Sequence, residues 1–161
     1  MIRRWLWTLT ILTLLMPVQA FAAGSCVFSI PTTGSGFTQY QWVCTADGSG
    51  DVSSPTITGD GYTQKLFGKL VQFTITPGTG GDAPDALYDV DLFDSNDATI
   101  NYLGTSGDNL SQTVTAIGAP VTPDGWSWFL YYRQVTPSAS GCGASNKFTL
   151  SILMYDPYRG H

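Results

Sequence analysis

Residues 66–76 read LFGKLVQFTIT and form the clearest alternating segment of the chain. Their β-branched and aromatic side chains favour an extended strand, in which successive side chains point to opposite faces. The two expected faces are Leu70, Gln72, Thr74 and Thr76 on one side and Lys69, Val71, Phe73 and Ile75 on the other. This segment therefore predicts one strand of a β-sheet.

Similar short apolar runs lie on both sides of this segment, and turns rich in Gly, Pro, Asn and Asp separate them. The further strands expected are 26–30, 37–45, 55–58, 88–93, 99–103, 112–117, 126–135 and 148–155. These runs show strand alternation and lack the 3.6-residue period of a helix. The pattern predicts an all-β fold, an antiparallel β-sandwich or jelly roll of seven to nine strands.

Alternation also predicts which side chains share a face. One shared face consists of Tyr40, Trp42 and Cys44, and another of Phe148, Leu150, Ile152 and Met154. Tyr88, Val90 and Leu92 are expected to face inward, and Asp89 and Asp91 outward. The segment 126–135 is apolar on both faces, which predicts a central strand covered from two sides. The Gly-containing segment 136–146 is expected to be a loop.

The first 23 residues have the three parts of a secretory signal peptide. Arg3 and Arg4 precede an apolar run over 5–16, and residues 20–22 read AFA, a small-residue cleavage site. The run is shorter than the roughly 20 residues that span a bilayer as a helix, so no transmembrane helix is expected in the mature chain. We expect an exported protein in the periplasm, at the cell surface or outside the cell, with one β-sandwich domain over 24–161.

Two alternatives concern the type of leader. The Arg3–Arg4 pair followed by apolar residues is also compatible with a twin-arginine leader. The small residues before Cys26 are compatible with a lipoprotein that is anchored through this cysteine. Ordinary unfolded export remains the favoured interpretation.

The mature part is acidic. Without Arg3 and Arg4, five Lys and Arg residues stand against twelve Asp residues, a net charge of −7, and the chain contains no Glu. Phosphate recognition needs clustered Lys and Arg side chains. The composition therefore argues against nucleic-acid binding.

Three cysteines, Cys26, Cys44 and Cys142, would meet an oxidising compartment, which predicts one disulfide and one remaining thiol. Pairing of Cys26 with Cys44 is favoured because it joins two neighbouring N-terminal strands. Pairing of Cys44 with Cys142 is the alternative and would leave Cys26 for a lipid or an intermolecular bridge. The wide spacing and the lack of nearby histidine argue against zinc.

Six aspartates fall within residues 82–97. Four of them, Asp89, Asp91, Asp94 and Asp97, are candidate oxygen ligands for calcium, the one cofactor that the sequence suggests. Their spacing does not match an EF-hand loop. The favoured alternative is that these residues cap turns and solvate an exposed face.

The aromatic segment 126–135 suggests a second candidate site. Trp126 and Trp128 share one side of the expected strand and could stack on a glycan, although aromatic residues on both sides favour a core role. No catalytic residue is assigned. The only histidine, His161, is the last residue, and the aspartates lie in polar sequence where burial and a raised pKa are not expected. The protein is predicted not to be an enzyme.

The chain also resembles a group of small structural proteins of tailed phages over about residues 40–155. The resemblance is carried by YQWVCTADGSG at 40–50, GKLVQFTITP at 68–77, GGDAP at 80–84, LYDVDLFD at 87–94, KFTL at 147–150 and LMY at 153–155. It implies a virion-associated β-sandwich, a head-decoration or fibre-like subunit without an active site. The leader departs from that pattern, because virion proteins need no export. A phage-encoded or host-captured copy at the cell envelope would reconcile the two observations.

Together these observations predict an exported, non-enzymatic structural or assembly protein. It would act by self-association or by binding another envelope or virion protein, since polar strand proteins associate by edge pairing or face packing. The alternative is a secreted ligand-binding module for glycans or calcium.

Overall fold

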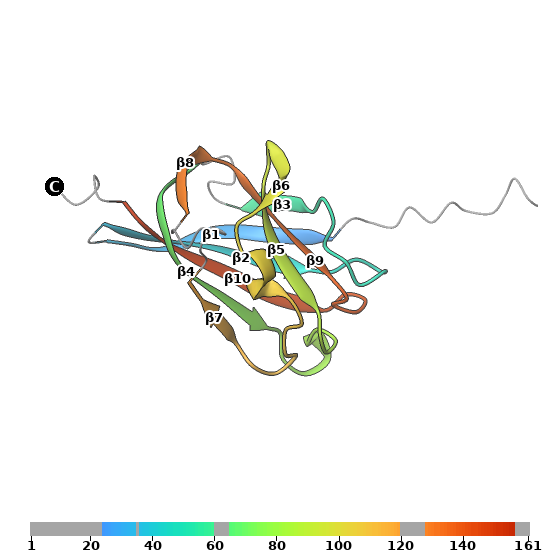
Figure 1. The fold of residues 1–161 in the computed structure, drawn as a ribbon. Helices are drawn as coiled ribbons and strands as arrows, with labels where there is room; N and C mark the ends of the chain where they lie inside the picture. Colours follow the sequence, from blue (N-terminus) through green and yellow to red (C-terminus); the bar gives the residue numbers. More distant parts are fainter. Residues whose placement is uncertain (1–23, 35, 60–64, 120–127, 157–161) are drawn as a thin grey trace, which may run out of the picture.

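The computed structural model describes residues 24–34, 36–59, 65–119 and 128–156, so the predicted leader and Trp126 lie outside it. These residues form ten strands and no α-helix (Figure 1). The strands are β1 (Ser25–Gly34), β2 (Phe37–Thr45), β3 (Thr56–Gly59), β4 (Leu66–Pro77), β5 (Asp89–Asp94), β6 (Asp97–Asn101), β7 (Ala116–Gly118), β8 (Phe129–Arg133), β9 (Val135–Ser140) and β10 (Lys147–Tyr155). Two short 3-10 turns cover Gly80–Asp82 and Gly104–Gly107.

The strands are arranged in two sheets. The large sheet has the order β3-β1-β2-β10-β4-β7, with β8 also paired to β4, and the small sheet has the order β6-β5-β9. The small sheet crosses one face of the large sheet (Figure 1). This confirms the predicted all-β sandwich, with one strand more than the expected upper number.

The core lies between the two sheets. β10 pairs antiparallel with both β2 and β4, so the three strands form the centre of the large sheet. The predicted alternation in β2 and β10 is confirmed, because Tyr40, Trp42, Cys44, Phe148, Leu150, Ile152 and Met154 are all buried. Val90 and Leu92 of β5, and Tyr88 just before this strand, face the core, as predicted.

β4 contains a β-bulge that the sequence pattern does not predict. The register against β10 shifts between Leu153 and Met154, which leaves Val71 as an extra residue. A one-residue insertion moves the side chains beyond it to the opposite face. The predicted division of this strand into two faces is therefore wrong, because it placed Leu70 opposite Phe73. The core-facing side chains of β4 are Leu66, Leu70, Phe73 and Ile75.

The apolar segment 126–135 is not a central strand, and this prediction is wrong. β8 ends at Arg133 in the large sheet, and β9 begins at Val135 in the small sheet. Within β8, Leu130 is buried and Phe129 is exposed. The segment is apolar on both faces because one face packs on the core and the other forms an aromatic surface.

β9 occupies the first part of the predicted loop 136–146, which corrects that prediction. It pairs antiparallel with β5, where Pro137 lies opposite Leu92. A proline is tolerated because β9 lies at the edge of the small sheet. Backbone hydrogen bonds from Val52 N to Ala139 O (2.9 Å) and from Ala139 N to Val52 O (3.0 Å) attach the loop after β2 to β9.

β3 lies at the edge of the large sheet, as expected for 55–58, but it runs parallel to β1. The connection after β2 first bonds to β9 through Val52 and then returns along β1. The large sheet is therefore mixed, whereas the sequence predicts antiparallel pairing throughout.

Candidate functional site

The disulfide joins Cys26 to Cys44, which confirms the favoured pairing. The two residues lie opposite each other in the β1–β2 ladder, with their Cα atoms 4.0 Å apart, and both are buried. The Sγ atom of Cys26 is therefore not available for a lipid. Cys142 carries the free thiol.

Cys142 is buried at the turn after β9. Its backbone N–H donates to Gly50 O (2.8 Å), and its carbonyl oxygen accepts from Asp85 N (2.8 Å). Burial raises the pKa of the Cys142 thiol to about 12, and the charges of Asp51, Asp85 and Asp89 add to this effect. Such a thiol stays protonated and is a poor nucleophile near neutral pH.

Cys142 is therefore expected to resist alkylation by iodoacetamide in the native protein. Because its pKa is about 12, labelling should not accelerate between about pH 7 and about pH 9, where an ordinary thiol gains most of its thiolate. Intact-mass measurement should find no adduct in the native, unreduced protein and one adduct in urea. The variant Ser53→Cys adds an exposed thiol and should gain one adduct when native. Native wild-type labelling that rises with pH would contradict this burial.

The four candidate calcium ligands are not brought together. Asp89 accepts from the backbone N–H of Asn109 (2.7 Å), and Asp91 accepts from the side-chain amide of Asn101 (2.5 Å). Asp97 accepts from the backbone N–H and the hydroxyl of Thr99, two residues further along the chain. Across the described ranges, no group of three or more His, Cys, Asp or Glu side chains is placed to hold a metal. This arrangement fits the turn-capping interpretation better than a calcium site.

Asp94, the fourth candidate, has a buried structural role. Its carboxylate accepts from the Tyr102 hydroxyl (2.8 Å) and the Asn96 backbone N–H (2.8 Å). The Arg133 guanidinium lies 3.5 Å away and is 47% exposed, whereas the Asp94 side chain is fully buried. Burial and the bond to Asp94 raise the pKa of Tyr102 above its usual range.

Asp91 differs from the prediction that these aspartates are not buried and have no raised pKa. Burial holds the pKa of its carboxyl above the usual range, and the charges of Asp108 and Asp89 add to this. The hydrogen bond from Asn101 acts in the opposite direction. Asp91 is thus partly buried although the surrounding sequence is polar. Its carboxylate lies beside the Asn101 side-chain amide, which donates a hydrogen bond to it.

A polar groove lies on the face of the large sheet that points away from the core. It has a volume of about 140 Å³ and is lined by Gln39, Gln72, Thr74, Ser151, Ile152 and Leu153. Next to it, the amide of Gln41 donates to the Ser151 hydroxyl (3.2 Å). Amides and hydroxyls both donate and accept, so the groove could hold an uncharged ligand rich in hydroxyl groups.

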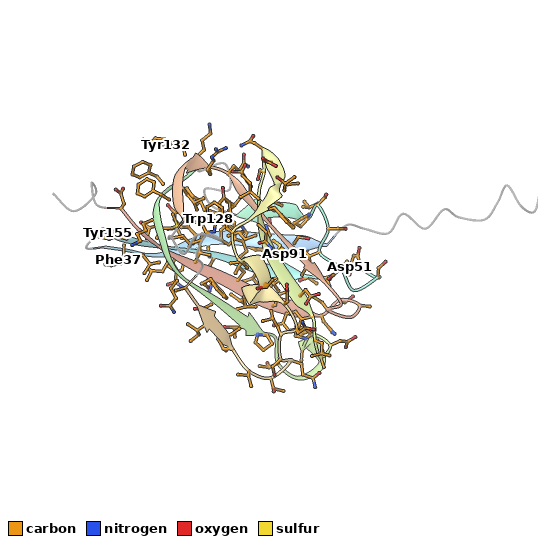
Figure 2. The ribbon with its side chains drawn as sticks, viewed as in Figure 1. Phe37, Asp51, Asp91, Trp128, Tyr132 and Tyr155 are labelled. Carbon is orange, nitrogen blue, oxygen red and sulfur yellow. A yellow bond between two sulfur atoms is a disulfide. The ribbon has the colours of Figure 1, made fainter. Side chains whose placement is uncertain are left out.

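An exposed aromatic surface lies at one end of the same face, and we call it the aromatic patch. It consists of Phe37, Phe67, Phe129, Tyr132 and Tyr155. Four of these rings, those of Phe37, Phe129, Tyr132 and Tyr155, are between 38% and 57% exposed. Figure 2 shows Phe37, Tyr155 and Tyr132 at the same end of the molecule.

Ring contacts arrange the patch in two groups, and Lys69 of β4 lies between them, opposite Tyr155 and Phe129. The centroids of Phe37 and Tyr155 are 5.1 Å apart, and Phe67 lies 5.7 Å from Phe129 and 5.2 Å from Tyr132. The register of β8 against β4 shifts beside Phe67, and Tyr132 adopts a positive φ of 52° there. This bulge brings the Tyr132 ring against Phe67.

A glycine allows the strands under the patch to approach closely. Gly68 has a φ of 123°, and a Cβ atom there would lie 2.6 Å from the carbonyl oxygen of Tyr155. A larger residue would therefore separate β4 from the end of β10. The aromatic patch is thus fixed by backbone packing as well as by ring contacts.

The sequence pattern does not indicate this patch as a whole, although it places two of the rings on an outward face. Phe37 and Tyr155 occupy outward positions in the alternation of β2 and β10. The pattern predicts Phe129 instead in a strand that is covered on both sides. Trp128, the proposed stacking residue, packs against the core with its ring edge-on to Tyr102 at 5.1 Å.

Comparison of the chain with protein-family models, curated proteins and solved structures finds no match. In the described part of the chain, no helix is long and apolar enough to cross a membrane.

Proposed function

We propose that the protein is an exported, non-enzymatic structural or assembly protein that self-associates through the aromatic patch. The observation that carries this proposal is the patch itself, four exposed rings gathered on one sheet face. Contiguous exposed apolar surface is typical of interaction sites, and aromatic residues are enriched in their centres.

Other features support the same proposal. A disulfide between two strands is typical of proteins that fold outside the reducing cytoplasm, which agrees with the leader-like N-terminus. Burial raises the pKa values of three described side chains, Cys142, Tyr88 and Tyr102. These groups are therefore held protonated, which agrees with a protein that does not use them as nucleophiles or bases. Resemblance to phage structural proteins also indicates a protein that acts through subunit contacts.

Sedimentation velocity of residues 24–161 is expected to show association that increases with protein concentration. The double variant Phe129→Ser/Tyr132→Ser should weaken this association by about thirtyfold or more, because central aromatic residues commonly contribute about 2 kcal/mol or more to an interface. The control Val114→Ser removes an exposed apolar side chain outside the patch and should leave the association constant unchanged. A wild-type protein that stays monomeric at every concentration would contradict the proposal.

A further inference from the structure

The two ends of the large sheet differ in charge and in apolar content. The end that carries the aromatic patch also carries Lys69, which lies opposite Tyr155 of β10 and Phe129 of β8. Lys65, the residue just before β4, is exposed. Neither lysine forms an ion pair within the described residues. The same end also carries one aspartate, Asp156, which follows Tyr155 and whose backbone N–H donates to Gly36 O (2.7 Å). The described charges at this end are therefore two lysines and one aspartate beside the aromatic rings.

The opposite end is strongly acidic, and we call it the acidic end. It carries Asp47, Asp51, Asp82, Asp85, Asp89 and Asp108. Of these six carboxylates, only that of Asp82 is in an ion pair with another described residue, Lys147, at 2.9 Å. β10 runs from Lys147 at this end to Tyr155 at the patch, a distance of about 26 Å for eight residue steps. That distance exceeds the Debye length of about 8 Å at physiological salt, so the two ends do not neutralise each other. Figure 2 shows Asp51 far from Phe37 and Tyr155.

The acidic end also presents one large apolar side chain, Leu87. It is 67% exposed and lies between Asp85 and Asp89 in sequence. Its backbone N–H donates to Leu110 O (3.0 Å), which holds the turn against the neighbouring chain segment. The acidic end thus presents an exposed leucine that two aspartates flank in sequence, and the opposite end presents aromatic rings with lysines.

We propose that the aromatic patch of one copy binds Leu87 and the surrounding carboxylates of the next copy, so that the chain associates head to tail. This inference rests on the proposed self-association and specifies its geometry. A two-fold contact between two acidic ends would bring like charges together, and a contact between two patches would place lysine against lysine. Head-to-tail contact pairs opposite charges and buries Leu87 on the rings. Such a contact is not self-limiting and produces linear chains of copies unless the rotation closes a ring.

A complementation experiment tests this geometry. The patch variant, Phe129→Ser/Tyr132→Ser, retains Leu87, and the variant Leu87→Asn retains the patch. Each variant alone is expected to be monomeric at concentrations where the wild type forms large species. An equal mixture should form a dimer of one copy of each and nothing larger, because one functional contact remains.

The Leu87→Asn variant has a built-in control for folding. Leu87 has a positive φ of 65°, a region that asparagine tolerates better than leucine. Its melting temperature should therefore not fall, and thermal unfolding checks this. A mixture that stays monomeric, or a Leu87→Asn variant that associates like the wild type, would overturn head-to-tail contact. A wild-type monomer at every concentration would instead contradict the self-association itself.

Charge reversal at each end adds a matched pair of variants. Lys69→Asp and Lys147→Asp change the net charge equally but at opposite ends of β10. Lys69→Asp is expected to weaken association by about tenfold, because it places an acid against the partner's carboxylates. Lys147→Asp makes the acidic end more negative and should not weaken association. Equal weakening by both variants would indicate general charge repulsion and would overturn the proposed contact.

Discussion

Replacing Asp94 with alanine is expected to lower the free energy of unfolding by about 3 kcal/mol. The buried carboxylate accepts hydrogen bonds from Tyr102 and from the Asn96 backbone, and it faces the Arg133 guanidinium. Removing it leaves the buried Tyr102 hydroxyl without this partner and opens a cavity. The exposure of Arg133 reduces the electrostatic part of the loss, so most of it comes from the lost hydrogen bonds.

Urea unfolding followed by fluorescence measures this loss. Asp97→Ala is the matched control, because Asp97 lies near the same turn but is exposed, and it should shift the unfolding midpoint much less. The double variant Asp94→Ala/Tyr102→Phe should lose less than the sum of the single variants, because each single variant already breaks the same bond. Additive losses would show that the Asp94–Tyr102 bond does not account for the effect.

Replacing both disulfide cysteines with alanine is also expected to lower the free energy of unfolding by about 3 kcal/mol. The bond joins residues 18 positions apart and restricts the unfolded chain, an effect of this size for a loop of that length. For a domain of this size, the loss corresponds to a fall of about 10 °C in melting temperature. Cys26→Ala/Cys44→Ala in differential scanning calorimetry gives the measurement.

Reductant provides an independent check of the disulfide. Dithiothreitol should lower the wild-type melting temperature toward that of the double variant and leave the variant unchanged. Cys142→Ala is the control, because it replaces a buried cysteine that is not in a disulfide. Its melting temperature should fall much less than that of the double variant. A wild-type melting temperature that does not respond to complete reduction would refute the expected contribution.

Several elements of the fold could be predicted because their signals are local. Strands β2 and β10 are regular and buried on one face, so the period of two places Trp42 and Ile152 correctly. The Cys26–Cys44 pairing was predictable because the two residues lie on consecutive strands joined by a short hairpin. The bulge at Val71 was not predictable in this way, because it exists only relative to the partner strand β10.

The candidate site was predictable only in part. For Trp126 and Trp128 the sequence favoured a core role over a stacking surface, and it indicated no other aromatic surface. Trp128 packs against the core, and the exposed rings come from β2, β4, β8 and β10. No single segment contains the patch, so no local pattern could reveal it.

Composition and alternation alone were enough to establish an all-β sandwich, because burying one face of a strand requires a period of two. Only the tertiary structure showed that β3 pairs parallel to β1 and that the chain passes from the large sheet at β8 to the small sheet at β9. It also placed the aromatic patch and Leu87 at opposite ends. These features depend on contacts between residues far apart in sequence, such as Val52 with Ala139. Alternation specifies which side of a strand is buried, whereas the choice of partner strand depends on the packing of the whole chain.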